Sequence, residues 1–264
     1  WIYGSTGNVA PFNLYDSTTP CTQDGQQIPA PWDNNFQSIW SALAQAAAAR
    51  YGNDPYLAYI TFSGLGQSVE SYLAKNSCED TEADNDGFPD AWITAAHTII
   101  GDWIVPWGQG YGIICFLATG QPTTGDGTTT MTTVANYGLN HYPNYFGLKS
   151  CGLGNNYPNN GYFPHTTIAI SGIGDNTSGC WVVYQLVGTV QGTHESLYSM
   201  LSNGLANNAN AIEVYAEDAN DPQKQTVVAE FNQDLITASG YSYLERTRKL
   251  LIAKTQPKLE NKRH

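Results

Sequence analysis

The stretch Ala211-Ile212-Glu213-Val214-Tyr215-Ala216-Glu217-Asp218 decides how the rest of the chain is interpreted. Its first part is short, mostly apolar and rich in residues that favour a β-strand. Its second part is acidic and has the composition of a helix start. Three of these eight residues are carboxylic acids, and Glu213 lies within the apolar part. The stretch therefore predicts a strand that leads into a helix and carries carboxylates at its carboxyl end.

Upstream of this stretch, strand and helix patterns alternate along the chain. Apolar runs of strand length occupy residues 57–63, 111–118, 145–150, 181–187 and 211–215. Helical periodicity occupies residues 33–52, 90–103, 129–141, 193–207 and 222–236, and a short helix is expected near 165–171. Long loops are expected over residues 1–32, 64–87 and 151–164.

This alternation predicts a parallel α/β fold. Because long loops follow the strands, we expect a (β/α)8 TIM barrel, which keeps its active site in the loops after its strands. Five strands are recognisable where such a barrel has eight, so a truncated or incomplete barrel is the alternative. We expect residues 1–239 to form this barrel, with or without its first strands, and residues 240–264 to form a basic tail or short helix.

The composition limits the classes of partner. The net charge of −12 argues against nucleic acid, because phosphate binding requires clustered Lys and Arg. Residues 1–239 hold only four basic residues against 21 acidic ones. No apolar run is long enough to span a membrane. The chain is rich in aromatic residues, which pack against the C–H faces of sugar rings, so the composition suits a carbohydrate partner. The sequence does not predict the oligomeric state.

The five cysteines are too scattered to form a zinc-binding pattern. Cys115 lies in an apolar run and is expected to be a buried thiol. The other four lie in polar surroundings and could form two disulfides, for instance Cys21–Cys78 and Cys151–Cys180. Together with the acidic composition and one glycosylation sequon at residues 176–178, this pattern favours an extracellular or secreted protein.

Two carboxylates at separate strand ends are the minimal machinery for glycoside hydrolysis. Glu213 belongs to the last predicted strand, and Glu70 follows the strand at 57–63. The alternatives are that Glu213 pairs with Arg50 or is solvated, and that Glu70 is a solvated loop residue. Further candidates for binding a sugar lie at strand ends or in nearby loops: Trp32, Trp107, Tyr162, His165, Tyr184, Gln185 and Tyr215.

The acidic stretch over residues 82–90 has some features of a calcium-binding loop, because carboxylates cluster around Gly87. It lacks the bidentate acid at the twelfth position, where Ile93 stands. We therefore expect an acidic surface loop, and the sequence predicts neither a metal nor a cofactor.

Several segments resemble the β-galactosidase-like retaining glycoside hydrolases on TIM barrels. They are Pro31-Trp32-Asp33, Trp40, residues 49–55 leading into a strand and Glu70, and residues 211–215 with an Asp downstream. The resemblance spans residues 29–235 and implies that Glu70 is the general acid/base and Glu213 the nucleophile.

The chain departs from that family's pattern in two ways. Val69 precedes Glu70 where the family has Asn, and the strand count places Gln185 where the nucleophile is expected. A non-catalytic glycan-binding or structural barrel module is therefore the alternative function.

Overall fold

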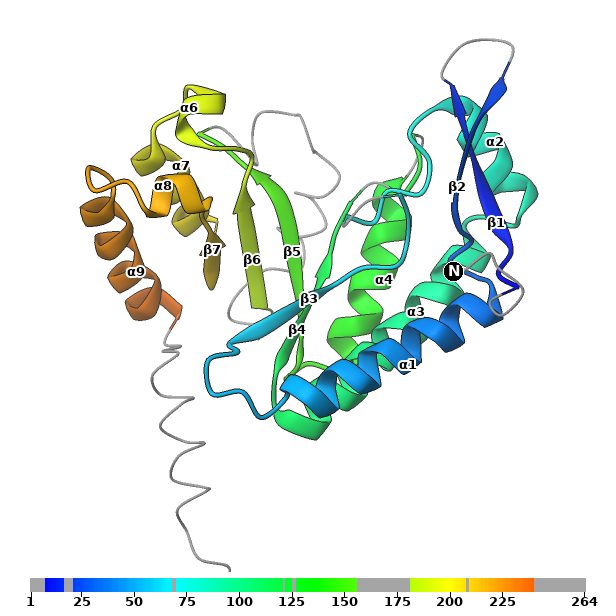
Figure 1. Ribbon diagram of the computed structural model, residues 1–264, viewed down its shortest axis with the longest axis horizontal. Coiled ribbons are helices and arrows are strands. Elements are labelled where there is room, and N and C mark those ends of the chain that lie inside the picture. The colour runs from blue at the N-terminus through cyan, green and yellow to red at the C-terminus, as the bar shows by residue number, and fades with distance from the viewer. Residues whose placement is uncertain are drawn as a thin grey trace, which may run out of the picture.

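The computed structural model describes residues 8–16, 21–67, 70–120, 122–124, 127–155, 181–207 and 209–239. Its centre is a parallel sheet of five strands in the order β3-β4-β5-β6-β7, which follows the chain (Figure 1). The strands are β3 (Tyr59–Phe62), β4 (Ile114–Ala118), β5 (Phe146–Leu153), β6 (Trp181–Leu186) and β7 (Ala211–Glu213). The five predicted strands and their parallel direction are confirmed. A closed eight-stranded barrel is not confirmed, because the sheet in the described residues has five strands.

Helices separate β3 from β4, β4 from β5 and β6 from β7, as the sequence predicts. The long ones are α1 (Asn34–Tyr51), α3 (Asp90–Ile104), α4 (Gly127–His141), α7 (Leu197–Ala206) and α9 (Gln225–Ser239). A π-helical segment, η1 (Val105–Gln109), continues α3, and α6 (Val190–Thr193) and α8 (Ala216–Ala219) are single turns. Asp33 caps α1 as expected, because its Oδ1 accepts a hydrogen bond of 2.8 Å from the backbone N–H of Phe36. The predicted helix near 165–171 and the tail at 240–264 lie outside the described residues.

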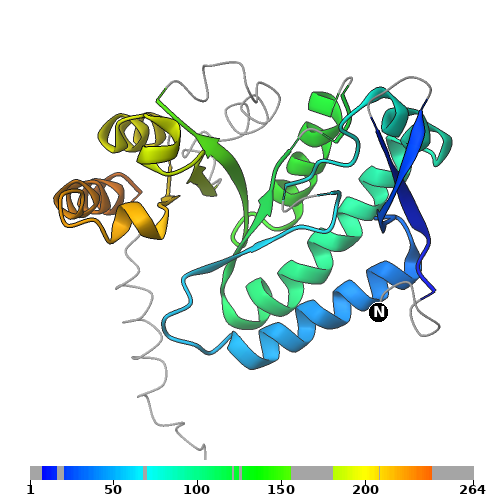
Figure 2. The same ribbon diagram turned by 45° about the horizontal axis from the view of Figure 1, so that its top comes forward.

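One large apolar core joins the helices to one face of the sheet. Leu117, Leu148 and Val182 contribute to it from neighbouring strands, and each is fully buried. Trp92 of α3 and Met200 of α7 belong to the same core, so helices from both halves of the chain cover this face. Figure 2 shows α1, α3 and α4 beside the first strands of the sheet and α7 to α9 beside its last strands.

The opposite face of the sheet, which we name the inner face, carries a second and smaller apolar cluster. Its buried members are Ile114, Phe116 and Val183, which alternate along β4 and β6 with residues of the helix-side core. Partly buried Tyr59 packs edge-on against Phe116, with 5.1 Å between the ring centroids. Only strand residues build this cluster, so no described helix covers the inner face.

The sheet is strongly curved around its inner face. The hydroxyl of Tyr59 donates a hydrogen bond of 3.1 Å to Oε1 of Glu213, although β3 and β7 are the two edges of the sheet. In a flat sheet these strands would lie four spacings apart, or about 19 Å. Curvature with the helices outside and side chains filling the inside is the arrangement of part of an α/β barrel.

An antiparallel hairpin stands where the sequence predicts a loop over residues 1–32. Its strands are β1 (Pro11–Asp16) and β2 (Thr22–Pro29). Phe12 and Leu14 are buried, but β2 has Ile28 as its one large apolar side chain, and its Gly, Gln and Asp residues hide the strand pattern. The prediction of a long loop there is wrong, because cross-strand and tertiary contacts form a strand that local pattern does not indicate.

The prediction of a loop over residues 64–87 is also wrong in part, because α2 (Ser77–Asn85) lies within it. This helix is polar and acidic, and its contacts with the hairpin hold it in place. Glu82 Oε1 accepts hydrogen bonds from the backbone N–H and the side-chain amide of Asn13, at 3.1 and 2.7 Å. A disulfide joins Cys21, which precedes β2, to Cys78 in the first turn of α2.

The Cys21–Cys78 disulfide confirms one predicted pairing, and Cys115 is a buried thiol as expected. Cys151 carries a free thiol, so the structure does not form the predicted Cys151–Cys180 bond. Cys180 itself lies outside the described residues. In the part of the chain that the structure describes, no helix is both long and apolar enough to cross a membrane.

Gly138 allows α4 to approach β5. A Cβ atom there would lie 2.4 Å from the ring of Phe146, which is fully buried and cannot move aside. Alanine favours a helix over glycine by about 1 kcal/mol, whereas overpacking a core costs about 1–3 kcal/mol. We expect Gly138→Ala to lower the free energy of unfolding in urea, whereas the control Gly110→Ala, with no neighbour closer than 3.7 Å, should not. Equal stability of the two variants would contradict this packing.

Candidate active site

Five polar side chains gather on the inner face and at the carboxyl ends of the strands: Tyr59, Glu70, Lys149, Cys151 and Glu213. We call them the inner polar cluster. Strand alternation and register bring them together. Lys149 and Cys151 alternate along β5 with Leu148 and Ser150, and Cys151 is paired through Gln185 of β6 with Glu213 of β7. The cluster thus draws on both edges and the centre of the sheet.

An ion pair lies at the middle of the cluster. Lys149 Nζ is 2.6 Å from Glu213 Oε2, and the two side chains are 10% and 31% exposed. The other oxygen of Glu213 accepts the hydrogen bond from Tyr59. The suggested pairing of Glu213 with Arg50 is wrong, since the guanidinium of Arg50 lies over the ring of Tyr51 instead. Both oxygens of Glu213 therefore have a fixed partner.

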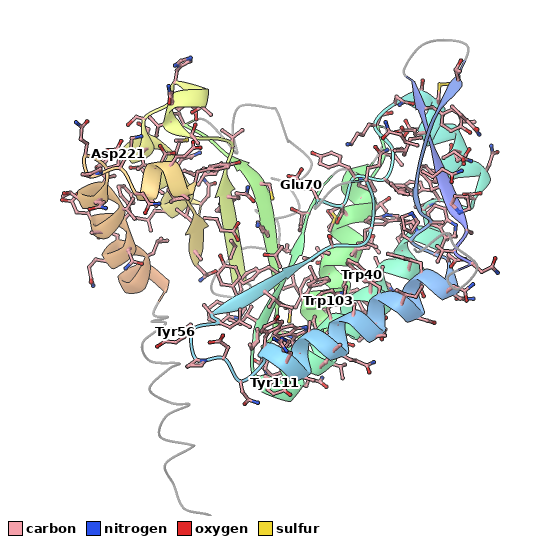
Figure 3. The ribbon with its side chains drawn as sticks, viewed as in Figure 1. Trp40, Tyr56, Glu70, Trp103, Tyr111 and Asp221 are labelled. Atoms are coloured by element: carbon pink, nitrogen blue, oxygen red, sulfur yellow. A yellow bond between two sulfur atoms is a disulfide. The ribbon has the colours of Figure 1, made fainter. Side chains whose placement is uncertain are left out.

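Glu70 occupies a different environment at the same end of the sheet. It follows β3 in the chain, and Figure 3 shows it towards the opposite end of the strands from Tyr56 and Tyr111, which precede β3 and β4. Burial raises the pKa of the Glu70 carboxyl. Hydrogen bonds from Cys151 and the positive charges of Lys149 and Lys75 oppose that rise without cancelling it.

Cys151 is influenced by the negative charges of both Glu70 and Glu213 and does not ionise near neutral pH. Burial, followed by the negative charge of Glu70, raises the pKa of its thiol to about 12. Burial also raises the pKa of the Tyr59 hydroxyl, and the charge of Glu213 raises it further. Both groups therefore keep their protons and act as hydrogen-bond donors to the carboxylates.

The two carboxyl groups of the cluster, those of Glu70 and Glu213, therefore have different surroundings. Burial favours the neutral form of Glu70, whereas Glu213 is ion-paired with Lys149. A pair of carboxyl groups in unlike environments can supply a proton donor and an ionised partner at one pH. This asymmetry is the chemical capability of the site.

Two of the predicted sugar-binding residues lie beside the cluster. Gln185 is the register partner of Glu213, and Tyr215 follows Glu213 by two positions. The amide nitrogen of Gln185 is 3.5 Å from the hydroxyl of Tyr215, and both side chains are accessible to solvent.

Other predicted binding residues are placed elsewhere. Tyr184 and Trp107 are 2% and 3% exposed and belong to the helix-side core. Trp32 packs against the same core, edge-on to Phe12. The structure does not bring these three together with the inner polar cluster, because strand alternation and apolar packing turn them towards the helices. Tyr162 and His165 lie outside the described residues.

The sequence pattern does not indicate Lys149, Tyr59 or Cys151 as members of this site. A signal for Lys149 exists, because a lysine within an apolar strand is rarely buried unless it has a partner. The scarcity of basic residues strengthens that signal, since Lys149 is one of only four in residues 1–239. The partner could not be read from the sequence, because it depends on the register of β5, β6 and β7.

Among the described residues, no group of three or more His, Cys, Asp and Glu side chains is placed to hold a metal ion. Much of the acidic stretch at 82–90 belongs to α2 and to the start of α3. Glu82 contacts the hairpin, as described above.

Comparison with known proteins identifies no family. No family model matches the chain, and no curated protein matches it. Among solved structures, the chain is similar to the catalytic domain of β-amylase from Paenibacillus polymyxa, with 9% sequence identity and a TM-score of 0.49. The similarity covers 97% of this chain and 77% of that one. A likeness at this level supports no conclusion about function, which therefore rests on the residues described above.

Proposed function

We propose that this protein is a glycoside hydrolase that cleaves O-glycosidic bonds of a poly- or oligosaccharide with two carboxyl groups. Glu70 is the general acid/base and Glu213 the nucleophile, so the reaction retains the anomeric configuration. The observation that carries the proposal is the unlike surroundings of these carboxyl groups, because burial raises the pKa of Glu70 whereas Glu213 is ion-paired with Lys149. The resemblance of residues 29–235 to β-galactosidase-like retaining enzymes supports the same two roles.

The reaction needs one carboxyl group in each protonation state. Burial raises the pKa of Glu70, so it can hold a proton and deliver it to the leaving oxygen. Glu213, ion-paired with Lys149, attacks the anomeric carbon and forms a covalent glycosyl intermediate. Glu70 then removes a proton from water, which releases the sugar and restores both groups. No cofactor is needed.

Gln185 and Tyr215 are proposed to bind sugar hydroxyls next to the nucleophile. Both are accessible to solvent and adjacent to Glu213. The Cys21–Cys78 disulfide supports an extracellular location, where such bonds persist.

The proposal is tested by incubating the protein with a panel of oligosaccharides and aryl glycosides. We expect hydrolysis, with the first-formed product in the anomeric configuration of the substrate by proton NMR. The alkaline limb of kcat/KM should lie above the ordinary pKa of glutamate, because the acid is Glu70 and burial raises its pKa. Inversion of the anomeric configuration would refute the role of Glu213 as nucleophile. Absence of hydrolysis across the panel would refute the proposal that the protein is a glycoside hydrolase.

A second candidate is a non-catalytic module that binds glycans. The occupation of both Glu213 oxygens by Lys149 and Tyr59 favours it, because a fully engaged carboxylate can be purely structural. A binding module would hold oligosaccharides in calorimetry without turnover, and Glu213→Gln would leave that affinity intact.

A further inference from the structure

Lys149 contacts the proposed nucleophile from the centre of the sheet. Its ammonium lies 2.6 Å from Glu213 Oε2, and its side chain is only 10% exposed. An ammonium with so little access to water requires an ionised partner, because an unpaired buried charge is strongly destabilising. Lys149 therefore favours the ionised form of Glu213.

Tyr59 holds the other oxygen of Glu213. It comes from β3, at the far edge of the sheet, and donates its hydroxyl at 3.1 Å to Oε1. Since a carboxylate has about four lone-pair sites, one partner on each oxygen leaves a site on each for a reacting atom. The two contacts fix the direction of the carboxylate without blocking it.

We infer that Lys149 is a positioning residue for the proposed reaction: it keeps Glu213 ionised and, together with Tyr59, fixes the orientation of its carboxylate. This inference rests on the proposed function. Lys149 acts on the reaction through its contact with Glu213, and its positive charge also lowers the pKa of Glu70.

The other groups that face Glu213 do not take over this role. Cys151 and Tyr59 are neutral donors, Gln185 and Tyr215 carry no charge, and Glu70 is itself an acid. The residues that β4 contributes to the inner-face cluster, Ile114 and Phe116, are apolar. Lys75 acts electrostatically on Glu70. Of the charged groups in the described residues, Lys149 is therefore the cation that is paired with Glu213.

The test is the pH dependence of kcat/KM in Lys149→Met, which removes the charge but keeps most of the side-chain volume. The acid limb reports the loss of the ionised nucleophile. Because a nearby positive charge favours the ionised form of a carboxyl group, the acid limb should move upward in Lys149→Met. The alkaline limb should move upward as well, because the charge of Lys149 also lowers the pKa of Glu70. Lys149→Arg keeps the charge and should restore the acid limb towards the wild-type position.

Lys75→Met is the matched control. It removes a cation that acts on Glu70, so the alkaline limb should move upward while the acid limb stays in place. If Lys149→Met proves unstable, Tyr59→Phe carries the test, because it removes the contact to Oε1 and keeps the charge. It should lower kcat with little change in KM.

A second readout does not require activity. A hydrogen-bonded ammonium exchanges its protons slowly, so Lys149 should give a proton–nitrogen NMR signal that is absent in Lys149→Arg and weakened in Glu213→Gln. If the protein hydrolyses no glycoside while this signal is present, the proposed function fails and the ion pair stands. If hydrolysis occurs and the acid limb of Lys149→Met coincides with that of the wild type, the proposed function stands and the positioning role is refuted.

Discussion

Glu70→Gln and Glu213→Gln are expected to lose activity in different ways that depend on the leaving group. With a sugar as leaving group, loss of the general acid should lower kcat/KM by about 10²–10⁴-fold in Glu70→Gln. With a nitrophenolate, which leaves without a proton, the same variant should keep most of its rate in the first step. Glu213→Gln should lose activity on both substrates, because no covalent intermediate can form.

Glutamine suits this experiment because it keeps the shape of each side chain. In Glu213→Gln the amide oxygen can still accept a hydrogen bond from Lys149 or Tyr59, but Lys149 loses its ionised partner, so the stability of this variant is measured together with its rates. Steady-state rates with both substrates, together with circular dichroism, provide the measurement. Equal losses for Glu70→Gln on both substrates would contradict its role as the acid, and full activity in Glu213→Gln would exclude it as the nucleophile.

Removal of the Cys21–Cys78 disulfide is expected to be the largest single loss of stability. The bond spans 57 positions in sequence, and the chain-entropy relation gives about 4 kcal/mol for a loop of this length. The double variant Cys21→Ala/Cys78→Ala should lose about 2–5 kcal/mol of unfolding free energy in urea. The hairpin and α2 should lose protection from hydrogen exchange first, because α2 has few apolar contacts of its own.

A reducing agent supplies the control for this experiment. It should destabilise the wild-type protein by a similar amount and leave the double variant unchanged, because the described free thiols, Cys115 and Cys151, form no cross-link. A loss below about 1 kcal/mol would mean that contacts such as that of Asn13 with Glu82 hold α2 without the disulfide.

The parallel sheet could be predicted from sequence because its strands are short apolar runs. The run at 111–118 contains the fully buried β4, and apolar patterning of this kind reflects burial directly. The hairpin and α2 could not be predicted in the same way. Their residues are polar, and their structure depends on a disulfide and on carboxylate contacts between distant segments.

The site could be predicted only in part, for a related reason. Glu213 and Glu70 are predictable because each lies at or after a strand end. Both belong to the inner polar cluster, and both act on the thiol of Cys151. That they act as the catalytic pair stays a prediction. Lys149 and Tyr59 join them through the curvature and register of the sheet, which no local pattern encodes. The prediction for Tyr184 and Trp107 depends on their being aromatic and near strand ends. Such a pattern does not show on which face of the sheet a side chain lies.

The contact between Tyr59 and Glu213 has a consequence for the order of folding. It joins residues 154 positions apart in the chain, the largest separation among the hydrogen bonds described here. The entropy of closing so long a loop must be overcome before the contact stabilises anything. Neighbouring strands such as β3 and β4 pair over much shorter separations, so they can form while β7 is still unattached. Among the described residues, the inner polar cluster is therefore completed only when β7 joins the sheet, and a chain in which only β3 and β4 have paired has no complete cluster.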